Sequence, residues 1–173
     1  MAFNNSEQIM VDTLPIGACV FTGPNHQIVA VNELMLEIWD KDHSIIGKEI
    51  REVIPELDGQ SFLKEMNEVY TAAVHLQKIE DRMLLRRNGR EEVLYLDYSF
   101  KPLLDSSGKV YGIVGMAVDS TEQVVNRQKL QETEQRQAFL LRLSDTLRPL
   151  AKAETIQTEA ARILGGYFKV SRV

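Results

Sequence analysis

Five short stretches of the chain predict β-strands: the fourth alternates apolar and polar residues, and the fifth is a largely apolar, β-branched run typical of a strand buried on both faces. The predicted strands cover residues 17–23, 27–31, 77–87, 92–104 and 110–118. The turn residues Gly23-Pro24-Asn25-His26 and Asn88-Gly89 predict a hairpin after the first strand and another after the third. In the fourth strand two alternating sets predict one apolar and one polar face: Leu94, Leu96, Tyr98 and Phe100 against Tyr95, Asp97, Ser99 and Lys101.

Between the second and third strands, apolar residues recur every three or four positions, which predicts helices. These helices cover residues 33–39 after an Asn32 cap, 45–54 before Pro55, and a stretch that begins at a Ser61 cap. A further helix at 6–14, stopped by Pro15, is too short to be stable alone. We therefore expect residues 1–14 to form a helical extension that lies on the domain or on a partner chain.

The order of these elements predicts the fold class. Two strands, three short helices and three strands give an α+β domain with a five-stranded antiparallel sheet and short helices on one face. The last three strands form a meander, and the first two pair beside the final one.

A long helix is predicted directly after the fifth strand. The strand pattern changes to a helical pattern at three good capping residues, Asp119, Ser120 and Thr121. Helix-forming residues follow to position 146. A seven-residue ladder runs along it through Leu130 and Gln137, with companions Asn126, Thr133, Leu140 and Leu147. Because this seam is largely polar, the helix is either a solvated linker or a weak parallel coiled coil in a dimer. We favour the coiled coil.

Composition narrows the class of protein. The hydrophobic fraction of 44% and charged fraction of 26% suit a soluble globular protein, and the net charge of −5 argues against nucleic acid as a partner. The single cysteine excludes a disulfide framework. The N-terminus lacks the pattern of a signal peptide, and no apolar run is long enough to span a bilayer, so we expect a cytoplasmic chain without membrane contact.

Short motifs in a fixed order resemble the PAS family of sensory domains. They are Leu14-Pro15-Ile16-Gly17, Val31-Asn32, Ile46-Gly47-Lys48, Arg87-Asn88-Gly89-Arg90, Lys101-Pro102-Leu103 and Asp119-Ser120-Thr121-Glu122. The last resembles the Asp-Ile-Thr sequence that ends many PAS domains, with serine in place of isoleucine. The resemblance covers about residues 15–122. It implies a pocket between helices and sheet, dimerisation through flanking helices, and a signal passed to an output domain.

The resemblance also allows two cofactors to be considered. Flavin photosensors of the family place a reactive cysteine in a helix and keep amide side chains at positions that correspond here to Leu96 and Ala117. The only cysteine, Cys19, lies on the first predicted strand, so we expect no photoactive flavin. Haem would need a ligand such as His75, which we interpret as a surface or strand-edge histidine, so we expect no haem.

No catalytic or metal-binding pattern is present in the sequence. It has no phosphate-binding glycine loop, no nucleophile elbow and no clustered histidines or cysteines, so we expect neither an enzyme nor a metal site in this chain.

An apolar pocket is the remaining candidate site. Its predicted lining is Trp39, Phe62, Met66, Tyr70, Leu96, Tyr98, Ile113 and Ala117. Gly115 and Ala117 share the face of Ile113 and leave space, either for a small apolar or carboxylate ligand or for tightly packed side chains. We favour a core that fills itself, and identify no ligand.

The last residues resemble the opening of a GAF domain. Pro149 should break the long helix, a second helix should cover 154–164 until Gly165-Gly166, and a strand should begin at 167. We therefore divide the chain into an extension (1–14), a PAS domain (15–120), a signalling helix (121–147) and a truncated GAF start (148–173). The expected function is that of a sensory module in a bacterial histidine kinase; the alternative is a scaffold for dimerisation without a ligand.

Overall fold

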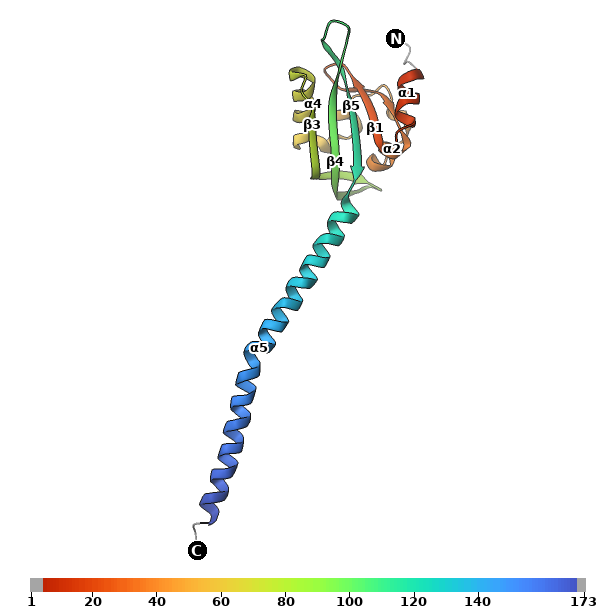
Figure 1. The fold of residues 1–173 in the computed structure, drawn as a ribbon. Helices are drawn as coiled ribbons and strands as arrows, with labels where there is room; N and C mark the ends of the chain where they lie inside the picture. The colour runs from red at the N-terminus through yellow and green to blue at the C-terminus, as the bar shows by residue number, and fades with distance from the viewer. Residues whose placement is uncertain (1–4, 171–173) are drawn as a thin grey trace. The chain divides into compact units, whose positions relative to one another are not determined.

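The computed structural model describes residues 5–170 and contains one five-stranded antiparallel sheet (Figure 1). Its strands are β1 (Gly17–Thr22), β2 (Gln27–Val31), β3 (Leu76–Arg87), β4 (Arg90–Leu104) and β5 (Val110–Asp119). The helices are α1 (Asn5–Asp12), α2 (Glu33–Trp39), α3 (Ile50–Val53), α4 (Ser61–Ala72) and α5 (Thr121–Val170), with short 3-10 turns η1 (His43–Ile45) and η2 (Pro55–Leu57).

The strand order is β2-β1-β5-β4-β3. The last three strands form the predicted meander, and β1 pairs with β5, so that Gly17 lies opposite Ala117 and Thr22 opposite Gly112. The α+β class and the sheet topology are therefore confirmed. The N-terminal hairpin and the C-terminal strand meet at the centre of the sheet.

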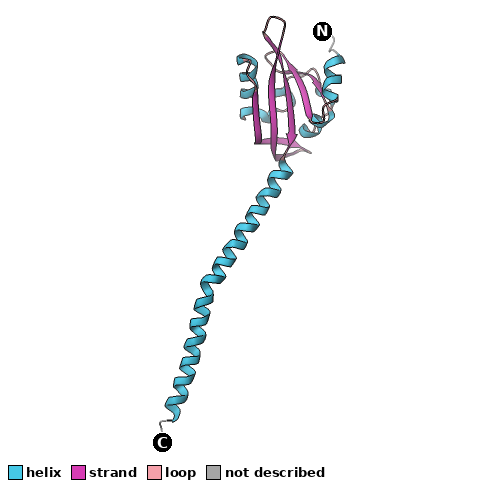
Figure 2. Ribbon diagram, in the orientation of Figure 1, coloured by secondary structure: helices cyan, strands magenta, loops and turns pink. Residues whose placement is uncertain are grey.

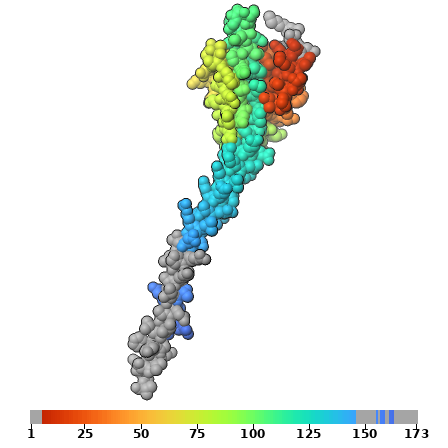
Figure 3. Space-filling model, in the orientation of Figure 1, coloured from red at the N-terminus to blue at the C-terminus, as the bar shows by residue number. Residues whose placement is uncertain are grey.

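Figure 2 shows the strands of the sheet in magenta and the helices around it in cyan. Each face of the sheet has its own apolar cluster. The main core lies between one face and the segment from α2 to α4, and it contains the alternating residues of β4 that were predicted to be apolar. The opposite face carries a smaller cluster in which Val11 of α1 packs near Ala18, Val20, Val29 and Ala30. The prediction that the helices lie on one face is therefore correct for α2 to α4, while α1 lies on the other. In Figure 3, α1 (red) shares the surface with the green strands β4 and β5.

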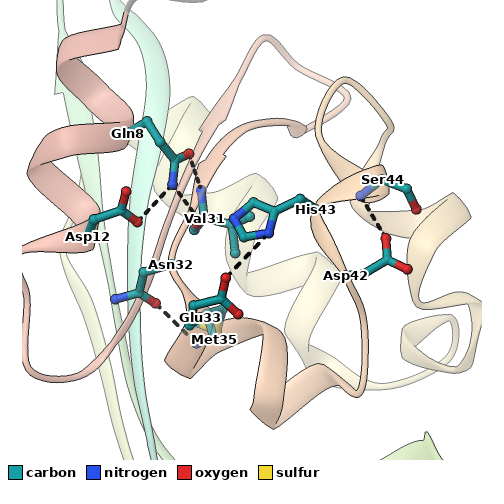
Figure 4. Close-up of polar contacts among 9 residues, drawn as sticks. All are labelled: Gln8, Asp12, Val31, Asn32, Glu33, Met35, Asp42, His43 and Ser44. Carbon is teal, nitrogen blue, oxygen red and sulfur yellow. Dashed lines mark hydrogen bonds and ion pairs between the residues drawn. The ribbon is translucent and has the colours of Figure 1, made fainter.

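Polar contacts hold α1 and α2 to the first hairpin (Figure 4). The Asn32 side chain accepts hydrogen bonds from the N–H groups of Met35 (3.1 Å) and Ala18 (2.9 Å), which confirms it as the cap of α2. Its amide nitrogen donates to the carbonyl oxygens of Val11 (3.0 Å) and Ile16 (2.8 Å). One buried amide therefore binds α1, β1 and α2 together.

Glutamine side chains occupy both edges of the sheet. Gln8 donates to the carbonyl oxygen of Val31 on β2 (2.7 Å) and accepts from its N–H (3.2 Å). Gln60 makes the same pair of bonds with Leu84 on β3, at 2.8 and 3.0 Å. A carboxamide thus takes the place of a neighbouring strand at one residue of each edge.

Two helix boundaries differ from the prediction. Residues 45–54 do not form one helix but end η1 and form α3, because Gly47 takes a positive φ of 89° and its N–H bonds to Ile28 of β2. The cap of α4 is Gln60, and Ser61 is the first helical residue.

The C-terminal part of the chain is a single helix as far as it is described. Contacts divide the chain into two compact units at Val124/Val125, and α5 begins in the first unit. The predicted break at Pro149 and the predicted end at Gly165-Gly166 are both wrong, because α5 continues through them to Val170. A helix satisfies its own backbone hydrogen bonds, whereas the predicted strand at 167–173 would need a partner strand. Residues 171–173 lie outside the described residues.

Candidate functional site

The main core encloses a small cavity between the helices and the sheet. It is lined chiefly by apolar side chains from β1, α2, η2, α4 and strands β3 to β5, and has a volume of about 20 Å³. A cavity of this size holds about one water molecule. A larger ligand would need side chains to move.

Five of the eight predicted pocket residues line this cavity: Trp39, Phe62, Leu96, Tyr98 and Ala117. Met66 and Ile113 are instead fully buried in the surrounding core, and Tyr70 packs its ring against His26 at 5.9 Å. Gly115, which the sequence placed on the face of Ile113, also lines the cavity. The sequence reasoning missed the other lining residues, namely Cys19, Phe21, Met35, Leu57, Met83, Leu85, Phe100 and Met116. The period of two in β4 already placed Phe100 beside Tyr98, so this residue could have been found.

The space beside Gly115 is filled by side chains of the core. A Cβ atom at this position would lie 3.1 Å from the Cys19 sulfur and from the Phe100 ring, and 3.2 Å from the Phe21 ring. These contacts are tighter than ordinary van der Waals distances, so the missing side chain makes room for an aromatic cluster. Phe62 and Tyr98 extend the cluster, with ring centroids 5.1 and 5.4 Å from that of Phe100.

The hydroxyl group of Tyr98 ends the apolar region in a charged cluster that was not predicted. It lies 2.6 Å from a carboxylate oxygen of Glu65 on α4 and 3.0 Å from one of Asp81 on β3. Lys78 forms an ion pair with Glu65 at 3.1 Å. Burial raises the pKa of Tyr98, and the hydrogen bond to Glu65 raises it further. Burial of Glu65 opposes its charged form, but the hydrogen bonds from Tyr98, Lys78 and Ser61 outweigh burial and lower its pKa.

The predicted junction residues lie close together and bind strand β4. Ser120, only 2% exposed, donates its hydroxyl to the carbonyl oxygen of Tyr95 at 2.9 Å. The N–H of Tyr95 donates to the Thr121 hydroxyl at 2.9 Å. Asp119 accepts from the N–H of Thr121 at 2.9 Å and forms an ion pair with Arg87 at 3.5 Å. The start of α5 is therefore fixed to strand β4 through the hydroxyl groups of Ser120 and Thr121.

The described side chains offer few groups that could bind a flavin, a haem or a metal ion. Cys19 is buried on β1, and burial raises the pKa of its thiol, which disfavours the reactive thiolate. Among the side chains that the structure describes, no group of three or more His, Cys, Asp or Glu residues could hold a metal ion. Leu96 and Ala117 do line the cavity, but neither side chain can hydrogen-bond a flavin ring. The expected absence of flavin and haem stays a prediction.

The helices also bear on membrane contact. None of those in the described part of the chain combines the length and the apolar character that crossing a bilayer requires.

Comparison with known proteins identifies the fold. The family described as "PAS fold" matches residues 11–125, well over half of the 173-residue chain. The PAS domain of Bordetella pertussis BvgS is similar with a TM-score of 0.53 and 20% identity, over 76% of this chain and 96% of that one. The Rhodobacter sphaeroides LOV protein gives 0.54 and 12%, over 69% and 71%. An RNA-binding Light-Oxygen-Voltage receptor gives 0.57 and 12%, over 78% of this chain, which spans only 37% of the receptor. At these identities the structural similarity shows the fold alone.

Proposed function

Since this chain belongs to the PAS-fold family, whose domains are sensory, we propose that it passes a signal to a downstream output domain through α5. The parent in this proposal is a multidomain bacterial signal-transduction protein, a sensor histidine kinase, in which a GAF domain follows α5 in the same polypeptide. The sensory domain itself is not an enzyme.

The observation that carries this proposal is the bonding of the junction. Ser120 and Thr121 exchange hydrogen bonds with the backbone of Tyr95 in the sheet. A change in the position of β4 must therefore either move the first turn of α5 or break these bonds. Side chains on the inner face of the same strand line the cavity, so cavity and helix share one strand.

The proposal allows two sources of signal, a bound partner chain or a small ligand, and the volume of the cavity distinguishes between them. A volume of about 20 Å³ favours the scaffold alternative, in which the domain binds a partner or a second copy without a ligand. If a ligand does bind by displacing side chains, the chemistry of the site favours an apolar one. The carboxylates of Glu65 and Asp81 near the Tyr98 hydroxyl would repel a ligand carboxylate at that end.

A homodimer forms part of the proposal. Two apolar residues of the predicted seam on α5, Leu130 and Leu140, are 60% and 51% exposed in the single chain. An apolar row on a long helix is stabilised when a second helix covers it. We assign the second copy of α5 as that cover.

The experiment that tests the proposal changes the phase of α5 in the full-length protein. One residue inserted between Lys129 and Leu130 rotates the following helix by about 100°, whereas seven inserted residues restore nearly the same face. We expect the one-residue insertion to change autophosphorylation from labelled ATP at least tenfold, and the seven-residue insertion to preserve it. Equal activity in both would contradict transmission through α5. Absence of phosphorylation in every form, with another output regulated by phase, would contradict only the kinase assignment.

A further inference from the structure

Strand β3 contains an unusual bulge close to the charged cluster. Its pairing with β4 shifts between Lys78 and Asp81, so that two residues, Ile79 and Glu80, lie opposite the single residue Asp97. Glu80 has a φ of 51°, in the left-handed region that is strained for a non-glycine residue. A conformation of this kind persists only where surrounding contacts hold it.

On the inner face of the sheet, the residues that flank the bulge bind the cavity cluster. Lys78 pairs with Glu65, and Asp81 lies against the Tyr98 hydroxyl. This hydroxyl has a single proton for two carboxylates, and the shorter distance, 2.6 Å against 3.0 Å, favours Glu65. Asp81 is therefore the weaker partner of the Tyr98 hydroxyl. Any displacement of Tyr98 or Glu65 changes the contacts of Lys78 and Asp81, the two residues that flank the bulge.

On the outer face, the neighbour of Tyr98 in β4 holds the same bulge and the start of α5. One oxygen of Asp97 accepts the N–H of Glu80 at 2.7 Å, and the same oxygen lies 3.2 Å from the Ser120 hydroxyl. The Ser120 hydroxyl also has one proton, which it can give either to Asp97 or to the carbonyl oxygen of Tyr95 at 2.9 Å. Ser120 thus has two alternative acceptors at the first turn of the helix.

We propose that Asp97 is the positioning residue that couples the cavity to α5, by linking the β3 bulge to the Ser120 hydroxyl. This inference rests on the proposed function, because it names the route by which the sensory domain would act on its helix. When the bulge shifts, Asp97 follows the Glu80 N–H, and the Ser120 proton turns to the Tyr95 carbonyl. The two alternatives for Ser120 supply the discrete change that coupling requires.

The test is a double-mutant cycle read by amide hydrogen exchange in the ¹⁵N-labelled chain. Tyr98→Phe keeps the ring and removes the hydroxyl. The N–H of Val124 donates to the backbone carbonyl oxygen of Ser120 in the first turn of α5. We expect Tyr98→Phe to accelerate hydrogen exchange of this N–H by about tenfold in the parent protein. In an Asp97→Ala background the same substitution should leave Val124 exchange within twofold. Ser99→Ala, on the same strand and face as Asp97, is the matched control and should leave the tenfold effect intact.

Equal effects of Tyr98→Phe in both backgrounds, or no effect at Val124 in the parent, would overturn the proposal. If Asp97→Ala does not fold, Ser120→Ala replaces it in the cycle; Tyr98→Phe should then still change exchange at Glu80 but no longer at Val124. These measurements need neither a dimer nor an output domain. A failed insertion experiment would therefore contradict the proposed function without affecting this result, and the reverse also holds.

Discussion

Among single residues, Asn32 joins several elements of the sensory domain. Its buried amide accepts two backbone N–H bonds and donates two bonds to backbone carbonyls, one of them on α1. Both the accepting and the donating half of the side chain are therefore used. A residue that only caps a helix needs the accepting half alone.

This difference predicts an unusual result for Asn32→Asp. Aspartate is an equally good helix cap on exposed sites, but here it cannot donate to Val11 and Ile16 and it places a charge in a site only 3% exposed. We expect a loss of roughly 2–4 kcal/mol in the free energy of unfolding, measured by urea denaturation. The reverse exchange at an exposed cap, Asp42→Asn, is the control and should change stability far less. Equal effects at both caps would show that Asn32 acts as a cap only.

The buried side chain of His26 predicts how stability depends on pH. Its Nε2 atom bonds to Asn67 at 3.0 Å, and its Nδ1 atom is buried without a hydrogen-bond partner in the described structure. Burial lowers the pKa of His26 below its ordinary value near 6.5, against the smaller opposite effect of Asn67. The folded state then binds fewer protons than the unfolded state as pH falls below 6.5. The contribution of His26 to the free energy of unfolding should be constant above pH 6.5. It should decrease as the pH falls below 6.5, until the pH reaches the pKa of His26 in the folded state.

Urea denaturation between pH 7.5 and 5 tests this expectation. The slope that His26 contributes should approach, and not exceed, about 1.4 kcal/mol per pH unit. His26→Asn should remove it, since asparagine tolerates the φ of 55° at this turn. His75→Gln, at an exposed position, should keep the slope of the parent. If His26→Asn keeps the slope, another group is responsible.

The site residues show which part of the chemistry a sequence can reveal. Leu96, Tyr98 and Ala117 were found because strands alternate, so their common face follows from position. Lys78 and Asp81 were not assigned to the site, because a regular strand would not allow both to face Tyr98. Only the bulge between them brings both to one cluster, and no residue pattern in β3 marks its position.

At the level of elements, both edge strands are protected by helices or turns that carry a glutamine. Gln60 bonds to Leu84 of β3, and the N–H of Arg86 two residues on donates to Glu56 of η2 at 2.6 Å. Unpaired edge strands invite association with other chains. The segment from η2 to the start of α4 therefore stabilises the domain and also shields β3.

Replacing this clamp should weaken the domain and expose its edge. Gln60→Leu leaves the N–H and carbonyl of Leu84 without the two side-chain bonds, so we expect a loss of about 1–3 kcal/mol in thermal or urea unfolding. Increased self-association should appear in light scattering. Gln77→Leu, at an exposed glutamine on β3 itself, adds the same apolar group and serves as control. Similar association in both variants would assign the effect to surface hydrophobicity.

The elements themselves were largely predictable, and the exceptions have a common cause. Turn residues such as Asn88-Gly89 marked the strand ends, and the antiparallel pairing of β3 with β4 confirms this part of the predicted meander. By contrast, the helix at 45–54 was interrupted by backbone bonds between Gly47 and Ile28, and Pro149 did not end α5. In both cases the outcome depends on which partners are available to the backbone, and local propensity contains no such information.

For the whole molecule, the proposed dimer makes the apolar side chains of α5 the decisive feature. Leu140 lies on the predicted seam and is 51% exposed in the single chain, whereas the exposed Gln135 lies off the seam. We expect Leu140→Glu to place two like charges opposite each other in a parallel pair, and to weaken dimerisation at least tenfold, about 1.4 kcal/mol. Gln135→Glu adds the same charge and should have little effect. Sedimentation velocity on residues 1–173 at 1 to 100 μM measures both. If the parent chain is a monomer at tens of micromolar, the dimer is contradicted, and α5 is interpreted as a solvated linker helix. If both substitutions weaken dimerisation equally, net charge, and not the seam, controls the association.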